Sequence, residues 1–401
     1  MIINIKAGTA EGCIKAQPSK SMAHRSLICG ALSKESEISG ISFSDDIKAT
    51  LSCLEMLGAK VQVNGDTVKI GGLNPFDPHI KGKLFCNESG STLRFLVPLC
   101  LVSQKEICLN GTERLFERPL DVYKHLCQSA ELEFCTDKTS VTLKGPLKSG
   151  KYAVEGNVSS QFISGLLFAL PLLVGDSIIE ITGAAESLSY IKLTLKTLDD
   201  FGIKVTIADE HTLLVPGSQH YRNCNITVEG DYSNSAFFAA LNSLGGNVKI
   251  EGLPENSFQG DRVYKELFIK LCEGGAQIDV SDCPDLAPIL FALAAAKSGA
   301  VFTGTARLKL KECDRAAAMK EELAKFGIPV IVEENRVVIE NAQLHAPSVI
   351  LDGHNDHRIV MALSILCTLT GGKIDGAQAV DKSYPAFFRD LAELGISVEC
   401  L

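Results

Sequence analysis

The stretch LDDFGIKVTI at Leu198–Ile207 reads as the tail of an amphipathic helix, a glycine and a short apolar strand. This pattern occurs six times, at Leu54–Val63, Leu126–Phe134, Leu198–Ile207, Leu271–Val280, Leu323–Val332 and Leu391–Cys400. A glycine occupies the helix-to-strand junction in five copies, and Ser129 occupies it in the second. Glycine suits the left-handed backbone with which many helices end. The junctions lie roughly 50 to 75 residues apart, too far for a solenoid, and predict six copies of one βα unit.

The totals indicate a two-domain protein of the cytoplasm. At 401 residues the chain exceeds what one core usually serves, so the six repeats divide into two sets of three. No apolar run approaches the roughly 18 to 20 residues of a membrane span. The N-terminus, MIINIKAGTAEG, lacks the basic start and apolar centre of a signal peptide. We therefore expect a cytoplasmic protein that makes no use of a membrane.

The cysteines and the net charge exclude several classes of function. The chain has 14 cysteines, but no CxxC pair occurs and most lie among apolar neighbours, as Cys100 does between Leu99 and Leu101. This spacing argues against disulfides and metal ligation. The net charge of −9 argues against a general nucleic-acid binder. An anionic ligand would need a local cluster of cations.

A small polar cluster precedes each of six long apolar helical runs. The clusters are Pro18–Ser21 before 23–32, Glu88–Thr92 before 93–102, Ser159–Gln161 before 162–174, Asp231–Ser235 before 236–244, Asp282–Asp285 before 286–296, and Asn355–Arg358 before 359–370. Helix capping explains Ser, Thr, Asp and Asn at such places. Capping does not require Lys20, Arg25, Arg94 or Arg358, whereas a helix start beside a cation makes an anion site. The last three clusters also supply Asp231, Asp285 and Asp356, acids able to orient groups or move protons.

Further cations lie in three polar segments. Thr112–Pro119 precedes a helix, and Lys309–Arg315 leads into a helix expected over 316–326. If the second segment is already helical, Lys311 and Arg315 are i,i+4 neighbours that repel unless an acid or a ligand anion separates them. The alternative is a solvated helix start with ion pairs. Lys382 stands just before the last helix, where a surface lysine is the default interpretation.

With these residues assembled, the chain resembles the 5-enolpyruvylshikimate-3-phosphate synthase family over essentially its whole length. The resemblance rests on eight short motifs in the right order: PSKSMAHR at 18–25, SGSTLR at 89–94, ERP at 117–119, VSSQ at 158–161, PD at 284–285, KECDR at 311–315, NDHR at 355–358 and KSYP at 382–385. It implies an α/β (α+β) fold, a two-domain inside-out α/β barrel of six βαβαββ repeats, three in each domain about a pseudo-threefold axis. The implied domains are 18–228 and 1–17 with 229–401, with the active site in the cleft between them.

The family reaction moves the enolpyruvyl (1-carboxyvinyl) group of phosphoenolpyruvate to the 5-hydroxyl of 3-phosphoshikimate and releases phosphate. It belongs to the shikimate pathway of aromatic amino acid biosynthesis. The resemblance implies no metal and no organic cofactor, and we expect a monomer acting on two small molecules. Both substrates are multiply anionic, which requires several lysines and arginines.

The resemblance also assigns individual residues. Those that would hold 3-phosphoshikimate are Lys20, Ser21, Arg25, Ser159, Ser160, Gln161, Ser187, Asp285 and Lys311. Those that would hold phosphoenolpyruvate are Lys20, Gly90, Arg118, Gln161, Arg315, Arg358 and Lys382. Asp285 would accept the proton of the 5-hydroxyl, and Glu312 would protonate C3 of phosphoenolpyruvate, with Lys20 as a possible partner in proton transfer.

Three departures from the family pattern stand beside these motifs. The usual Asn-Ala-Gly-Thr-Ala-x-Arg reads ESGSTLR at Glu88–Arg94, which keeps Gly90, and with it the space used by the herbicide glyphosate. Arg307 stands where some members contact substrate through Asn, and His24 stands where Asn is frequent.

Three alternatives were weighed against this assignment. The sister enzyme that transfers enolpyruvyl to UDP-N-acetylglucosamine uses a Cys ahead of its Arg-Pro, and residues 111–117 contain none. Its Lys-Asn pair is also replaced by Lys20 and Ser21. An RNA-end cyclase with related repeats conflicts with the acidic net charge and needs a catalytic His motif that is missing. A non-catalytic small-anion binding protein would keep the cations but would not need both Asp285 and Glu312.

Overall fold

The computed structural model describes residues 1–184 and 186–401. Its contacts divide the chain into two compact units. We call Pro18–Glu229 the contiguous unit, and Met1–Gln17 together with Gly230–Leu401 the discontinuous unit. In the described residues no helix combines the length and the apolar character needed to cross a bilayer. The 14 cysteines are free thiols, of which seven are buried and five, including Cys13 and Cys400, are exposed.

The sheets of the contiguous unit share one topology. Each begins with two parallel strands, and its third strand runs antiparallel to both the second and the fourth. In strand order the sheets are β14 (Asn225–Thr227), β3 (Ser36–Ser39), β5 (Thr67–Gly71) and β4 (Lys60–Asn64); β6 (Leu84–Phe85), β7 (Ile107–Asn110), β9 (Ser140–Lys144) and β8 (Glu133–Thr136); and β10 (Lys151–Glu155), β11 (Ser177–Thr182), β13 (Thr212–Val215) and β12 (Thr206–Asp209).

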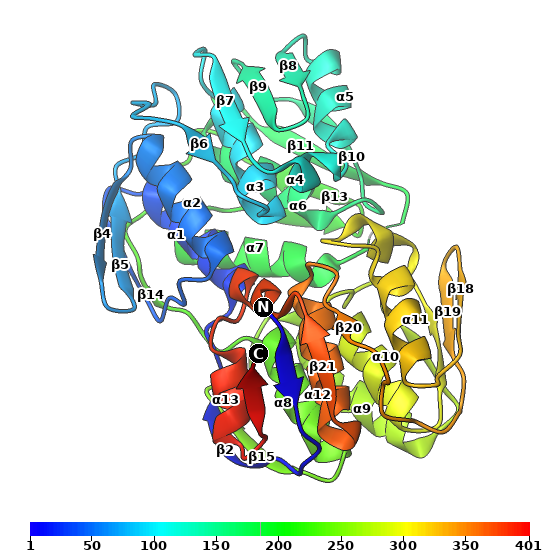
Figure 1. Ribbon diagram of the computed structural model, residues 1–401. Helices are drawn as coiled ribbons and strands as arrows, with labels where there is room; N and C mark the ends of the chain where they lie inside the picture. The colour runs from blue at the N-terminus through cyan, green and yellow to red at the C-terminus, as the bar shows by residue number, and fades with distance from the viewer. Residues whose placement is uncertain (185) are drawn as a thin grey trace. The chain divides into compact units, whose positions relative to one another are not determined.

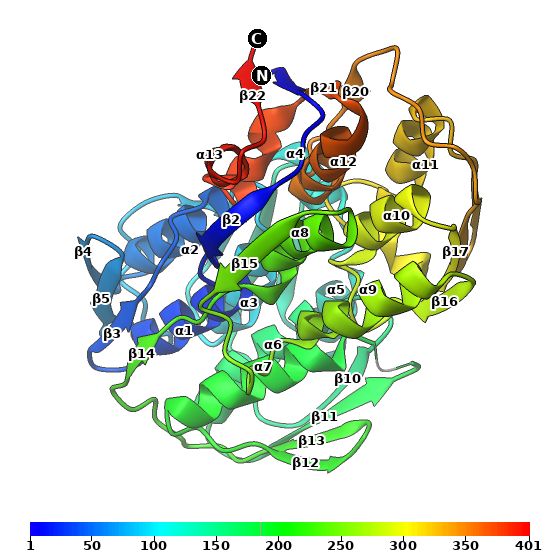
Figure 2. The ribbon, with the colours of Figure 1, turned by 90° about the horizontal axis from the view of Figure 1, so that it is seen from below.

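The discontinuous unit repeats this topology with strands from both ends of the chain. In strand order its sheets are β20 (Leu351–Asp352), β21 (Gly372–Asp375), β1 (Ile3–Ile5) and β22 (Val398–Cys400); β16 (Ala276–Asp279), β17 (Ala300–Thr303), β19 (Arg336–Ile339) and β18 (Val330–Glu333); and the pair β15 (Asn247–Glu251) and β2 (Glu11–Lys15). Strand β1 lies between β21 and β22 and is antiparallel to both (Figure 1). Strand β2 runs parallel to β15 (Figure 2). The first 15 residues therefore complete two sheets whose other strands follow residue 246.

Six buried helices fill the two cores. They are α1 (Lys20–Leu32), α3 (Gly90–Leu101) and α6 (Ser160–Ala169) in the contiguous unit, and α8 (Tyr232–Ser243), α10 (Ala287–Ala296) and α12 (His357–Thr370) in the discontinuous unit. In α10 every residue except Ala296 is buried. The strands instead alternate, as in β10, where Tyr152 and Val154 are buried between exposed residues. Helices that are apolar all round and sheets that are apolar on one face give each unit its helices inside and its sheets outside.

A second set of helices is amphipathic and leads into the repeat junctions. These are α2 (Asp45–Met56), α5 (Asp121–Ser129), α7 (Leu188–Asp200), α9 (Tyr264–Glu273), α11 (Arg315–Lys325) and α13 (Phe387–Glu393). The short helix α4 (Glu113–Glu117) and 3-10 turns at Leu170–Leu172, Gly260–Val263, Ala306–Leu310 and Ala377–Lys382 complete the helical elements of the described chain. The prediction of six βα repeats is thereby confirmed.

The junction of the second repeat differs from the prediction. After α2, Gly58 has a φ of 113°, its N–H bonds to Glu55, and the next N–H bonds to Leu54, which is the Schellman ending of a helix. After α5 the same two bonds start from Glu131 and Leu132, and Glu131 has a φ of 54°. The prediction that Ser129 holds this junction is wrong, because Ser129 still belongs to α5. A glutamate therefore takes the left-handed position that glycine holds elsewhere.

Candidate functional site

The six polar clusters of the sequence lie at the starts of the six buried helices. In five of them a side chain caps the first turn by accepting a backbone N–H, namely Ser19, Ser89, Ser159, Asp231 and Asp356. Helix α10 is different, because its N-cap is Leu286 and no side chain bonds to its first turn. Capping thus accounts for five of the clusters, but it does not explain Asp285.

Asp285 is instead surrounded by three cations. Its Oδ1 lies 2.8 Å from Nη1 of Arg315 and 3.2 Å from Nζ of Lys311, and its Oδ2 lies 3.6 Å from Nη2 of Arg358. Burial raises the pKa of Asp285, but these three cations outweigh it, so the pKa lies well below its usual value. Asp285 is therefore a carboxylate with an excess of positive charge around it.

Arg315 connects the acids of this group. Its side chain is 1% exposed, and it bonds to Asp285, to Oε2 of Glu312 at 2.9 Å and, through Nε, to Oδ2 of Asp356 at 2.8 Å. The three carboxylates raise the pKa of Arg315 against the effect of burial. A buried charge is tolerated when charged partners and hydrogen bonds surround it. Arg315 therefore holds Asp285 and Glu312, the two predicted proton-transfer residues, in one network.

The possibility that Lys311–Arg315 is already helical is wrong. Helix α11 begins at Arg315, with Asp314 as its N-cap, and Lys311 has extended backbone with a φ of −83° and a ψ of −162°. Lys311 and Arg315 come together because both bond to Oδ1 of Asp285, so the acid separates the two cations as the charge argument requires. Burial lowers the pKa of Lys311, and the charges of Arg315 and Arg307 lower it further.

Two more cations of the discontinuous unit hold backbone carbonyls. Nη2 of Arg307 donates to the carbonyl of Ser281 at 2.6 Å, so this departure from the family pattern ties down the segment before Asp285. Nζ of Lys382 donates to the carbonyl of Asn355 at 2.6 Å. Lys382 is thereby anchored to the loop that leads into Asp356 and Arg358.

Three of the residues predicted to bind 3-phosphoshikimate, Lys20, Ser21 and Arg25, lie in the first two turns of α1. Nζ of Lys20 lies 2.9 Å from Oδ2 of Asp46, at the start of α2. Arg25 is buried and donates to Oγ1 of Thr194 at 2.7 Å, to the carbonyl of Ser21 at 2.7 Å and to that of Tyr190 at 3.2 Å. Burial lowers the pKa of Arg25 to about 10, which leaves the guanidinium charged at neutral pH.

A second group joins α3 to α6. Nη1 of Arg94 donates to Oε1 of Gln161 at 2.8 Å, and Nε2 of Gln161 donates to Oγ of Ser91 at 3.0 Å. Arg94 also donates to the carbonyl of Pro119 at 3.0 Å, immediately after Arg118. Arg94 thus fixes the orientation of the side-chain amide of Gln161. A fixed orientation determines which hydrogen bonds the amide can offer to a ligand.

Gly90 leaves room for Arg118. A Cβ added to Gly90 would lie 2.9 Å from Nη1 of Arg118 and 3.0 Å from its Cζ and Nη2. A side chain at position 90 would therefore displace the guanidinium of Arg118. Ser159 and Ser160 begin α6 next to Gln161. Ser187 precedes α7 with a φ of 56° and is buried.

Sequence reasoning missed two acids whose charges act on predicted site residues. Asp46 was not singled out, although it is the partner of Lys20 in an ion pair. Asp261, in the 3-10 turn Gly260–Val263, is buried, and burial together with the charge of Asp285 raises its pKa to about 7. Neither lies in a motif, and a single acid in a long sequence gives no signal of the charge that it will face.

The comparisons with known proteins identify the family of this chain. A family model described as EPSP synthase (3-phosphoshikimate 1-carboxyvinyltransferase) matches residues 6–391. The chain belongs to the EPSP synthase family. It is 39% identical to the 3-phosphoshikimate 1-carboxyvinyltransferase of Clostridium kluyveri, over 99% of this chain and 98% of that one. It is 38% identical to the enzyme of that name from Clostridioides difficile, over 98% and 97% of the two chains.

Solved structures of the EPSP synthase family share the fold. The EPSP synthase of Acinetobacter baumannii superimposes with a TM-score of 0.80 at 22% identity, and the match covers 100% of both chains. The family and the fold class predicted from the sequence are both confirmed. The family match over nearly the whole chain also decides against the alternative families weighed from the sequence.

Proposed function

We propose that this chain is a 3-phosphoshikimate 1-carboxyvinyltransferase in which the residues of both units act on one pair of substrates. It transfers the enolpyruvyl group of phosphoenolpyruvate to the 5-hydroxyl of 3-phosphoshikimate and releases phosphate. The observation that carries the proposal is the Asp285 network, in which an ionised acid, a second acid and three cations share hydrogen bonds and ion pairs. A protein that only binds anions would not need Asp285 and Glu312 beside its cations, because their negative charge opposes the binding of an anion.

The contiguous unit supplies most of the 3-phosphoshikimate contacts. Lys20, Ser21 and Arg25 stand at the start of α1, and Ser159, Ser160 and Gln161 stand at the start of α6. Hydroxyls and unpaired N–H groups at a helix start, together with cations, suit a phosphate. Ser187 adds a hydroxyl before α7. From the discontinuous unit, Asp285 receives the 5-hydroxyl and Lys311 a further oxygen.

Phosphoenolpyruvate takes the remaining cations. Arg315, Arg358 and Lys382 of the discontinuous unit and Lys20, Gly90, Arg118 and Gln161 of the contiguous unit bind its carboxylate and phosphate. Arginine is suited to this task because its planar fork matches both groups. Both substrates are multiply anionic, so their carboxylate and phosphate groups can pair with these cations.

The reaction is an addition followed by an elimination. The oxygen of the 5-hydroxyl forms a bond to C2 of phosphoenolpyruvate while Asp285 takes the proton of that hydroxyl. Glu312 gives a proton to C3. The tetrahedral adduct then loses a proton from its new methyl group, the bond from C2 to the phosphate oxygen breaks, and phosphate leaves. Lys20 is the second group that could move the methyl proton.

The resting charge of Asp285 fits the role of a base. Its depressed pKa keeps it ionised, but a strongly depressed pKa also makes a weak base. The cations that depress it, Lys311, Arg358 and Arg315, are the ones assigned to the anionic substrates. Bound substrate charge would offset them and raise the proton affinity of Asp285, so the base becomes stronger when both substrates are present.

The experiment mixes the protein with 3-phosphoshikimate and phosphoenolpyruvate and follows phosphate release. We expect release that needs both substrates, and no release from folded protein would refute the proposal. Asp285→Asn should lower kcat by a hundredfold or more, on the order expected for a general base. Asp282→Asn is the matched control, because it removes a nearby exposed acid of the same segment.

We further propose that the enzyme acts as a monomer in the cytoplasm, without metal or organic cofactor.

A further inference from the structure

Glu322 is a fully buried carboxylate outside the groups assigned to substrates. It lies on α11 seven residues after Arg315, which is about two turns further along the same face. Its side chain is 0% exposed. Oε1 accepts from Nζ of Lys325 at 2.7 Å and lies 3.0 Å from Nε2 of His354, while Oε2 accepts from Lys325 at 2.9 Å and from the backbone N–H of Asp352 at 2.9 Å.

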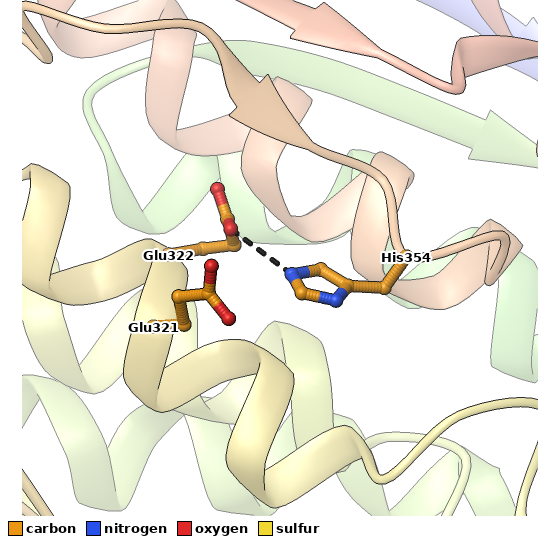
Figure 3. Close-up of side chains that lie close together, drawn as sticks. All are labelled: Glu321, Glu322 and His354. Atoms are coloured by element: carbon orange, nitrogen blue, oxygen red, sulfur yellow. Dashed lines mark hydrogen bonds and ion pairs between the residues drawn. The ribbon is translucent and has the colours of Figure 1, made fainter.

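This cluster resembles a metal site but already contains a cation. The ligand atoms of Glu321, Glu322 and His354 lie within 4.8 Å of one another, a donor set that divalent metals use. Figure 3 shows His354 pointing at Glu322, with Glu321 beside it. However, the ammonium of Lys325 contacts both oxygens of Glu322, so this carboxylate already has a cationic partner. The bonds of Glu322 therefore join α11 to the segment 352–354 without a metal.

The segment from Asp352 to Arg358 needs such support. His354 and Asn355 have φ values of 47° and 51°, in the left-handed region that costs about 1 kcal/mol or more for residues other than glycine. Neighbouring bonds must hold this backbone in place. Glu322 holds its beginning through Asp352 and His354, and Arg315 holds its end through Asp356. Both anchors come from the same face of α11.

This segment carries or contacts the cations assigned to phosphoenolpyruvate. Arg358 is its last residue, the carbonyl of its Asn355 accepts from Lys382, and its Asp356 accepts from Arg315. A shift of the segment would therefore move all three cations together. Displacements on the order of 1 Å in such groups can cost a hundredfold in rate.

We propose that Glu322 is a positioning residue for phosphoenolpyruvate, which acts by fixing the segment 352–358 against α11. The proposal rests on the function proposed above for Arg315, Arg358 and Lys382. It assigns Glu322 no contact with a substrate. The effect should fall on phosphoenolpyruvate and spare 3-phosphoshikimate, whose assigned contacts lie mainly in the contiguous unit.

The test compares Glu322→Gln with its neighbour Glu321→Gln. Gln keeps the volume and one acceptor oxygen but cannot hold Lys325, His354 and the N–H of Asp352 together. We expect the KM for phosphoenolpyruvate to rise about tenfold, kcat to stay within about threefold, and the KM for 3-phosphoshikimate to stay within about twofold. Glu321→Gln removes an exposed acid of the same cluster and should leave all three values unchanged. His354→Ala removes one contact only and should give a smaller rise in the same KM.

Amide hydrogen exchange of residues 351–358 gives a second readout that needs no activity. Exchange there should be faster in Glu322→Gln than in the unaltered protein, and unchanged in Glu321→Gln. An unchanged KM for phosphoenolpyruvate in folded Glu322→Gln would overturn the proposal, as would an equal rise of both KM values or equal effects of the two variants. If the unaltered protein shows no turnover, the proposed function fails instead, and unchanged exchange would then overturn the positioning role independently.

Discussion

The substitution Gly90→Ala tests whether Arg118 binds phosphoenolpyruvate. The added Cβ would meet Nη1 of Arg118 at 2.9 Å, and ordinary contact begins near 3.4 Å, so the guanidinium must move by about 0.5 Å. The end of an arginine is flexible enough to move, and the fold should survive. A displacement of this size in a group that binds a reacting anion should cost about tenfold, or about 1.4 kcal/mol, in kcat/KM for phosphoenolpyruvate.

The assay is steady-state phosphate release with each substrate varied in turn. We expect the lower kcat/KM to come from a higher KM for phosphoenolpyruvate. The KM for 3-phosphoshikimate should stay unchanged within about twofold. Gly8→Ala is the matched control, because its added Cβ meets only Cδ1 of Ile396 at 3.7 Å. The reasoning is refuted if Gly90→Ala leaves the KM for phosphoenolpyruvate unchanged, or if it raises both KM values equally.

Three further predictions concern acids of the two units. Glu312→Gln should lower kcat by about a hundredfold or more while both KM values change little, because it removes a proton donor and leaves the substrate cations; a normal kcat in the phosphate assay would rule out this role. Burial and Asp285 raise the pKa of Asp261 to about 7, so between about pH 4 and 7 the folded protein keeps a proton that the unfolded chain loses, and stability falls as pH rises. Asp261→Asn should remove that fall. In thermal melts from pH 5 to 8, the stability of the variant relative to the unaltered protein should therefore rise with pH, by a few kcal/mol at most, since one pKa unit corresponds to about 1.4 kcal/mol. A difference in stability that stays constant with pH would contradict the raised pKa. Glu131→Gly should stabilise the protein by about 0.5 to 1 kcal/mol in urea unfolding, because glycine adopts the φ of 54° without strain; a loss of stability would show that the junction is not strained.

The starts of the buried helices could be predicted because their signals are local. A polar cluster followed by an apolar run marks Ser19, Ser89 and Ser159 as caps within a few residues. The motifs around Lys311 and Arg358 were specific for the same reason. Local signals are sufficient to predict a residue whose partners lie in the helix that it starts, as the partners of an N-cap do.

The errors and omissions have physical causes of two kinds. Ser129 was predicted at the second junction, but the two Schellman bonds fix Glu131 there, in a left-handed backbone that glutamate seldom adopts. Helical spacing was considered for Lys311 and Arg315, but Asp314 is the N-cap and the helix starts only at Arg315. Asp261 and Glu322 could not be recognised, because their burial and partners arise from packing between segments some 24 to 32 residues apart in the chain.

The place of β1 has a consequence for how the chain folds during synthesis. Domains generally fold as units while the chain is made from its N-terminus. The contiguous unit can close as soon as β14, at Asn225–Thr227, is available to pair with β3. Strand β1 is made first, but both of its neighbours, β21 and β22, lie after residue 371. Its backbone N–H and C=O groups therefore stay without sheet partners until almost the whole chain exists, and the protein's earliest strand becomes one of its last to be incorporated.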